Sequence, residues 1–180
     1  MDSTRSPDDL DAELRTLGAT PYLTSPAVGV ATLRNLVVYV ERRLPELDQI
    51  QALQRALDVT VRAHGPKSAH LHYVDFSHGA RFDESRRARF TELAKRYNGR
   101  LGVAAFVVVG GGFGGAIIRS VITKILLVIR QRTPTAMSDN LDDAARFYRR
   151  EIGRAPSADE MNAVVDVLCS DQKVRQAKPE

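Results

Sequence analysis

The stretch from Leu101 to Arg130 constrains the fold more than any other part of this 180-residue chain. It opens with Val103–Val109, an unbroken apolar run that is rich in β-branched residues and ends at glycines. Such a run predicts a strand covered on both faces, because a half-exposed strand alternates apolar and polar side chains. Five glycines then occur within six residues, followed by apolar residues at helical spacing as far as Ile129. The stretch therefore predicts a strand, a glycine turn and a very apolar helix.

Further strands and helices alternate around this unit. Val28–Leu33 and Leu36–Glu41 are strand-like runs separated by two residues, which is typical of a tight hairpin. Ala69–Phe76 and Thr135–Ser138 predict two more strands, and amphipathic segments lie between all of these runs. Strands that alternate with helices require a largely parallel sheet with right-handed crossovers. We therefore expect an α/β fold with a small, mostly parallel sheet opened by a β-hairpin, and about four helices.

The two ends of the chain are predicted to be helical extensions of this domain. Residues 1–27 hold a short helix that begins at Ser6, followed by a connector over Ala19–Ala27. The α/β domain itself spans residues 28–153. Residues 154–180 begin with a capping box at Ser157, which predicts a last helix, and a polar tail follows from Ser170.

Composition narrows the class of protein. Hydrophobic residues make up 43% of the chain and charged residues 27%, which is ordinary for a soluble globular protein. The net charge of +4 is mild, the basic residues are scattered and tryptophan is absent, so we expect no nucleic-acid binding. The single cysteine, Cys169, excludes an internal disulfide and agrees with a reducing cytoplasm. It has no activating neighbour in sequence, and we expect it to be unreactive.

Two features argue against export or membrane insertion. The N-terminus is acidic and polar, unlike a signal peptide. Leu101–Ile129 is long enough to cross a bilayer, but glycines interrupt it and Arg119 and Lys124 lie in its apolar half. We therefore expect a cytoplasmic protein without a transmembrane span.

The glycine turn resembles a phosphate-binding loop in its spacing. Gly110, Gly112 and Gly115 match the dinucleotide fingerprint, in which glycines let the backbone approach a pyrophosphate at a helix N-terminus. However, the turn belongs to the third strand–helix unit, and no acidic residue stands about twenty positions later. The pattern favours a spacing device, so we expect no cofactor. A nucleotide loop remains an alternative hypothesis.

Two histidines lie on the strand Ala69–Phe76. His70 and His72 are two residues apart, hence on the same face of the strand, and two imidazoles at that spacing can bind a metal ion. His78 and Asp75 are the only obvious third ligands. We favour histidines at the edge of the core, and predict no metal site.

A family resemblance rests on the residues that follow this strand. Asp75 and Ser77, then Phe82, Asp83 and Ser85, resemble the motif of STAS-like domains, the fold of bacterial anti-sigma factor antagonists. The resemblance covers roughly Val28 to Ile152, and Pro134–Met137 with Asn140–Ala145 resembles the closing strand and helix of that family. Two positions depart from the motif, because Glu84 replaces a serine and Arg86 replaces a glycine.

This resemblance implies a non-enzymatic signalling module that works by protein–protein contact. Its partner would be a regulatory kinase or an anti-sigma-like protein, and Ser85 or Ser77 would be phosphorylated. The docking residues implied by the resemblance are Asp75, Asp83, Arg86 and Arg87.

The apolar helix supports a second hypothesis. Ala116–Arg130 carries apolar residues on more than one face, among them Leu126, Leu127 and Val128, which exceeds what one sheet contact requires. This surplus indicates a small apolar or lipid ligand, or a homodimer formed through residues 116–130. We find no convincing set of catalytic residues, so an enzymatic function is the least favoured hypothesis.

Overall fold

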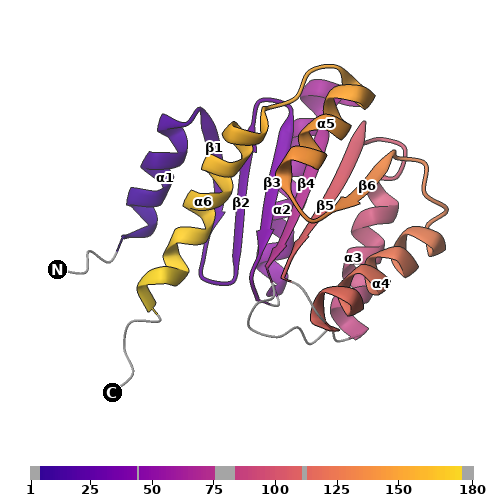
Figure 1. Ribbon diagram of the computed structural model, residues 1–180, viewed down its shortest axis with the longest axis horizontal. Coiled ribbons are helices and arrows are strands. Elements are labelled where there is room, and N and C mark those ends of the chain that lie inside the picture. Colours follow the sequence, from indigo (N-terminus) through magenta and orange to yellow (C-terminus); the bar gives the residue numbers. More distant parts are fainter. Residues whose placement is uncertain (1–4, 44, 76–83, 111–112, 176–180) are drawn as a thin grey trace.

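The computed structural model describes residues 5–43, 45–75, 84–110 and 113–175. It is an α/β fold in which one sheet lies between two layers of helices (Figure 1). The elements in chain order are α1 (Pro7–Thr16), β1 (Ala19–Thr24), β2 (Val28–Leu33), β3 (Leu36–Glu41), α2 (Leu47–His64), a 3-10 turn (Gly65–Lys67), β4 (Ala69–Asp75), α3 (Glu84–Tyr97), β5 (Val103–Val109), α4 (Phe113–Val128), β6 (Thr135–Ser138), α5 (Leu141–Ile152) and α6 (Ala158–Arg175).

The six strands lie side by side in chain order, β1-β2-β3-β4-β5-β6. β1, β2 and β3 pair antiparallel, whereas β3 through β6 pair parallel. The predicted hairpin is confirmed, with Leu33 opposite Leu36 and Arg34 in the left-handed region at φ 55°. β5 lies between β4 and β6 and is mostly buried, so the predicted covered strand is also confirmed.

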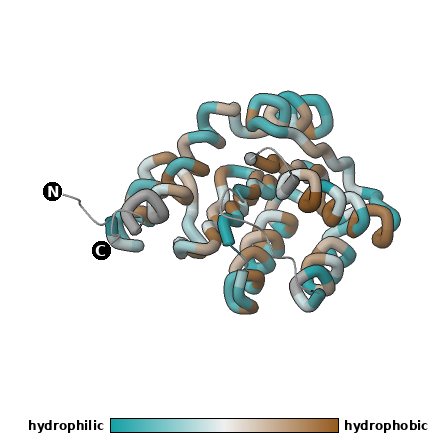
Figure 2. The backbone as a smooth tube through the Cα atoms, turned by 60° about the horizontal axis from the view of Figure 1, so that its bottom comes forward, coloured by the Kyte–Doolittle hydropathy of each residue, from teal (hydrophilic) through white to brown (hydrophobic). Residues whose placement is uncertain are grey.

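The order of the strands decides which face each helix covers. Crossovers between parallel strands are right-handed, so helices that join successive neighbours fall on one face of the sheet. That face carries α2, α3 and α4, while α1, α5 and α6 cover the other, and Figure 1 shows α5 and α6 in front of the sheet with α2 behind it. The helical tubes alternate brown and teal turn by turn in Figure 2, as expected for helices with one buried face.

Each face of the sheet has its own buried core. On the α5–α6 face, Tyr148 and Met161 are fully buried against strand residues such as Val38 and Leu71. Leu14 of α1 belongs to this same cluster. On the opposite face, α2 packs over β2 and β3, while α4 forms a smaller cluster with β4 and β5. The α4 cluster is separate from the α2 cluster.

Two segments differ from the prediction. The connector expected over Ala19–Ala27 contains strand β1, which pairs antiparallel with β2 and has an irregularity between Pro21 and Leu23. β1 is an edge strand, where a proline without an N–H group is tolerated. The polar tail expected from Ser170 is helical as far as Arg175.

None of the helices in the described ranges combines the length and the apolar character needed to cross a membrane. The apolar helix α4 has 16 residues.

Candidate functional site

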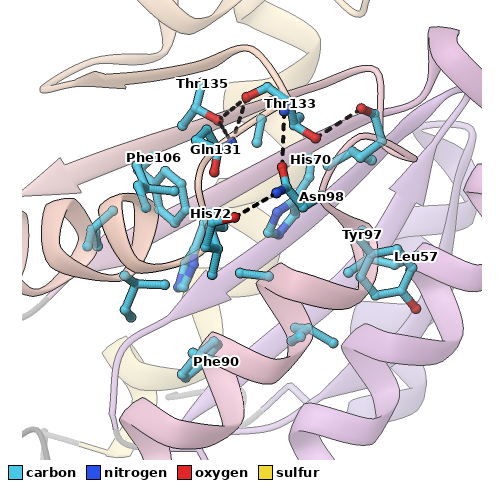
Figure 3. A pocket seen from close by; sticks show the side chains of 18 of the residues that line it. Leu57, His70, His72, Phe90, Tyr97, Asn98, Phe106, Gln131, Thr133 and Thr135 are labelled. Atoms are coloured by element: carbon cyan, nitrogen blue, oxygen red, sulfur yellow. Dashed lines mark hydrogen bonds between the residues drawn. The ribbon is translucent and has the colours of Figure 1, made fainter.

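A cavity of about 100 Å³ lies between α3, α4 and the sheet (Figure 3). Its walls are mainly apolar, with Phe90 and Leu93 from α3 and Ile122 and Ile125 from α4. Its floor is formed by the strands, and polar side chains from the floor and from the turn before β6 face it. We call this space the α3–α4 cavity.

The cavity has a local cause in the sheet. His70 on β4 stands opposite Ala104 on β5, and Ala104 stands opposite Thr135 on β6, so the three side chains form a row across one face. Neighbouring strands lie about 4.8 Å apart, which separates the outer two residues by roughly 10 Å. Only a methyl group fills the middle of this row, and all three residues line the cavity.

His70 is a buried base without a hydrogen bond at one nitrogen. Its side chain is 9% exposed, and its Nε2 atom has no hydrogen-bond partner in the part of the chain that the structure describes. Burial, with a smaller contribution from the nearby His72 imidazole, lowers the pKa of His70 from 6.5 to about 3. The imidazole is therefore neutral at physiological pH, and its free nitrogen can donate or accept one hydrogen bond.

The side-chain oxygen of Gln131 is a second buried atom without a hydrogen-bond partner among the described residues. Its Nε2 donates to the backbone carbonyl of Thr133 at 2.6 Å and to the Thr135 hydroxyl. A carbonyl oxygen only accepts, so the amide nitrogen must face Thr133 and the amide oxygen is left as a free acceptor. That oxygen, Oε1, is buried and has no partner among the described residues. Buried polar atoms normally find partners, so two such atoms on residues that line one small cavity indicate a place for a polar group.

His72, the other predicted histidine, is satisfied within the protein. Its Nε2 lies 2.9 Å from Oε2 of Glu41, whose side chain is 1% exposed. The rings of Tyr39, Phe90 and Phe106 surround the imidazole at centroid distances of 4.6, 5.6 and 5.4 Å. Burial and the Glu41 carboxylate raise the pKa of Tyr39 well above its usual value. Of the two histidines, His70 is therefore the one with an unpaired ring nitrogen.

Asn98 holds one end of the cavity in place. Its amide nitrogen donates to the carbonyl of Ile129 at 3.0 Å, and its amide oxygen accepts from the backbone N–H of Arg132 at 2.7 Å and of Thr133 at 3.3 Å. Gly99, the next residue, donates to the Thr133 hydroxyl at 2.9 Å. The end of α3 and the turn after α4 are therefore tied together, and Figure 3 shows Asn98, Thr133 and Gln131 joined in this way.

The structure supports the predicted placement of the histidines but adds no third metal ligand. His70 and His72 both line the cavity, on the same face of β4, as predicted. His78 lies outside the described residues. Within those residues, no group of three or more His, Cys, Asp or Glu side chains could hold a metal ion. Cys169 is half-buried on α6, and burial raises the pKa of its thiol.

The residues that carry the STAS-like resemblance are only partly described. Ser85 is exposed in the first turn of α3, and Asp75 is partly buried at the end of β4. Arg87 is exposed and forms an ion pair with Glu84 at 3.4 Å. Ser77, Asp83 and the side chain of Arg86 lie outside what the structure describes.

The glycine turn has a packing reason at one of its positions. A Cβ atom on Gly115 would lie 2.6 Å from the carbonyl oxygen of Gly110, closer than such atoms approach. Gly110 itself has φ 103°, a conformation that favours glycine. Gly112 lies outside the described residues. The close return of α4 over the end of β5 therefore accounts for Gly110 and Gly115 without any ligand.

No protein-family model, curated protein or solved structure matches the chain. The STAS-like resemblance therefore stays a hypothesis. The geometry of the α3–α4 cavity is the strongest guide to function.

Proposed function

We propose that the protein binds a small, mainly apolar ligand with one hydrogen-bonding group in the α3–α4 cavity, without catalysing a reaction on it. The observation that carries this proposal is the unpaired Nε2 atom of His70, a residue at the floor of a mainly apolar cavity. An unsatisfied buried polar group costs about 1–3 kcal/mol, and a ligand that supplies the missing partner recovers that free energy.

The size of the cavity sets the size of the ligand. Sites for drug-sized molecules measure roughly 300–1,000 Å³, whereas a cavity of about 150 Å³ suffices for benzene. A volume of about 100 Å³ is smaller than either value, so the largest ligand we expect is a single six-membered ring, admitted by small shifts of the apolar side chains, or a short acyl segment.

The position of the two unpaired atoms sets the chemistry of the ligand. Gln131 Oε1 can only accept, so it requires a donor such as a hydroxyl group. His70 stands at one end of the row across the sheet, and Thr135, whose hydroxyl accepts from Gln131, stands at the other end beyond Ala104. A hydroxyl placed over Ala104 suits either atom, because an O–H group both donates and accepts. A neutral ligand is favoured, since a charge would lose its hydration in this apolar space.

A matched pair of probes tests the proposal. Phenol and toluene have nearly the same size, but only phenol carries a hydroxyl group. We expect phenol to bind about tenfold more tightly than toluene, as measured by titration of backbone amide NMR signals, because one recovered hydrogen bond is worth about 1.4 kcal/mol. His70→Leu together with Gln131→Leu should abolish this preference while retaining toluene. Equal affinities in the unmodified protein, or no binding of either probe, would contradict the proposal.

A second candidate function follows from the STAS-like resemblance. As this second candidate, we propose that the protein is a non-enzymatic, cytoplasmic interaction module of bacterial type, with a regulatory kinase or anti-sigma-like protein as its partner. Ser85 supports this candidate, because it is exposed in the first turn of a 14-residue helix, where backbone N–H groups favour a phosphate. Incubation with a cell extract and ATP, followed by mapping of phosphosites, tests it. Modification at neither Ser85 nor Ser77 would remove the phosphorylation switch.

A further inference from the structure

The exposed end of α4 combines apolar and basic side chains in a way that the cavity does not explain. Leu127 is 73% exposed and Val128 is 68% exposed, the highest values among the large hydrophobic side chains that the structure describes. Lys124 precedes them by three and four positions and therefore lies on the same side of the helix. Arg130 and Arg132 follow in the turn and are also exposed. We call these five residues the α4 tip.

The charge around the α4 tip has one sign. The segment 93–138 contains no aspartate or glutamate. Its basic residues are Lys95, Arg96, Arg100, Arg119, Lys124, Arg130 and Arg132.

Three of these cations are neutralised by acidic residues from outside the segment or at its margin. Lys95 pairs with Glu92, Arg96 with Asp58, and Arg119 with Asp139. The other four, which include all the cations of the α4 tip, form no ion pair within the described part of the chain.

The backbone at the tip holds an arginine where glycine would be favoured. Arg130 has φ 51°, and its N–H group donates to the carbonyl of Leu127, while the next N–H, from Gln131, donates to Leu126. This is the helix-ending pattern whose left-handed residue is usually glycine. The Asn98 amide fixes the same turn. The fold therefore presents an arginine at a position where its backbone is strained.

We propose that the α4 tip docks on the surface of an anionic lipid bilayer, with Leu127 and Val128 inserted among the headgroups and Lys124, Arg130 and Arg132 contacting lipid phosphates. Exposed apolar side chains beside lysine and arginine are the requirements for binding such a surface. This inference does not depend on whether the α3–α4 cavity holds a ligand.

The observations favour a bilayer as the partner of the α4 tip over a second copy of the chain and over another protein. In a symmetric dimer the same patch meets itself, so the cations of one tip would lie close to the cations of the other and repel them. A specific protein interface buries about 800 Å² on each side, whereas the tip offers two neighbouring apolar side chains on one helical turn. The strength of lipid binding scales with the inserted apolar area plus the attraction of basic residues to anionic lipid, so two side chains with a basic rim predict a weak, salt-sensitive attachment.

Sedimentation of the full chain with vesicles tests the proposal. We expect the protein to bind vesicles that contain phosphatidylglycerol but not vesicles of phosphatidylcholine alone. Binding should weaken strongly between about 0.1 M and 1 M salt, as the screening length falls from about 10 Å to 3 Å. Absence of binding to the anionic vesicles at low salt overturns the proposal, and so does equal binding to both kinds.

Variants of the tip separate docking from general loss of structure. Leu127→Ser with Val128→Ser should reduce vesicle affinity at least tenfold. Lys124→Gln and Arg132→Gln should each reduce it roughly fivefold, since one cation near an anionic surface contributes about that factor. The matched controls on α2, Val59→Ser and Arg62→Gln, replace exposed residues of the same kinds and should leave binding unchanged.

Arg130→Gly is the most discriminating variant. Glycine relieves the left-handed backbone at this position, so the melting temperature should rise. The same change removes a cation from the tip, so vesicle affinity should fall about fivefold. A rise in both quantities, or an unchanged affinity, overturns the role given to Arg130. If light scattering shows a dimer that Leu127→Ser with Val128→Ser dissociates, a second copy covers the tip and the proposal fails.

Discussion

His70 is a buried base, and its replacement by leucine should change both the stability of the protein and the dependence of stability on pH. Leucine has a similar volume but no polar atom. In the absence of ligand, His70→Leu removes an unpaired buried nitrogen, so the free energy of unfolding at pH 7 should rise by about 1–3 kcal/mol.

The effect of pH follows from the pKa of His70. In the unfolded chain this pKa is 6.5, and in the folded protein burial lowers it to about 3. Between these values the unfolded state binds a proton that the folded state does not, so stability is lost as the pH falls below 6.5. Each pH unit corresponds to about 1.36 kcal/mol. Acidification from pH 7 to 4.5 should therefore cost the unmodified protein about 2.5 kcal/mol through His70 alone.

Urea unfolding followed by circular dichroism at pH 7 and pH 4.5 measures this loss. The other ionisable groups are present in both proteins, so the difference between the two pH dependences reports on His70. His64 is exposed at the end of α2, and His64→Gln is the matched control. Parallel pH dependences for the unmodified protein and His70→Leu would refute the reasoning, because they would mean that His70 is hydrated or paired in the folded state.

Three further predictions concern packing. Ala104→Leu should fill the cavity and abolish phenol binding in NMR titrations, whereas Ala116→Leu, an exposed change on α4, should leave binding intact. Asn98→Ala should lower the free energy of unfolding by about 2–4 kcal/mol in urea titrations, because it removes several hydrogen bonds that join α3 to the turn after α4. Gly115→Ala should destabilise by about 1–3 kcal/mol through contact with the Gly110 carbonyl, whereas Gly114→Ala, with open space around its Cβ, should be neutral or stabilising by up to about 1 kcal/mol. If the two alanine variants melt at the same temperature, the spacing role of Gly115 is wrong.

The sheet could be predicted from local patterns wherever a strand is marked by apolar runs and turn residues. β5 and the hairpin of β2 and β3 have the predicted bounds. A β-branched run that is bounded by glycine or by a two-residue turn is compatible with few structures other than a strand. β1 is not predicted from the sequence, because Pro21 argues against a strand unless that strand lies at the edge of the sheet. The edge position is known only from the order of strands in the folded sheet.

Only part of the candidate site could be predicted from the sequence. The two-residue spacing of His70 and His72 predicted a common face, which the structure confirms. Glu41 and Gln131 could not be predicted as their neighbours, because the pairing of β3 with β4 buries one and the turn after α4 places the other. Nor does any local pattern predict that Ala104 leaves a gap between two larger residues on adjacent strands.

A crystal structure of the protein with phenol bound tests the central claim most directly. We predict electron density for one ring over Ala104, with its oxygen within hydrogen-bond distance of His70 Nε2 or Gln131 Oε1. Ordered waters on both atoms with no phenol in the α3–α4 cavity would contradict the account, because the unpaired atoms would then be satisfied by solvent.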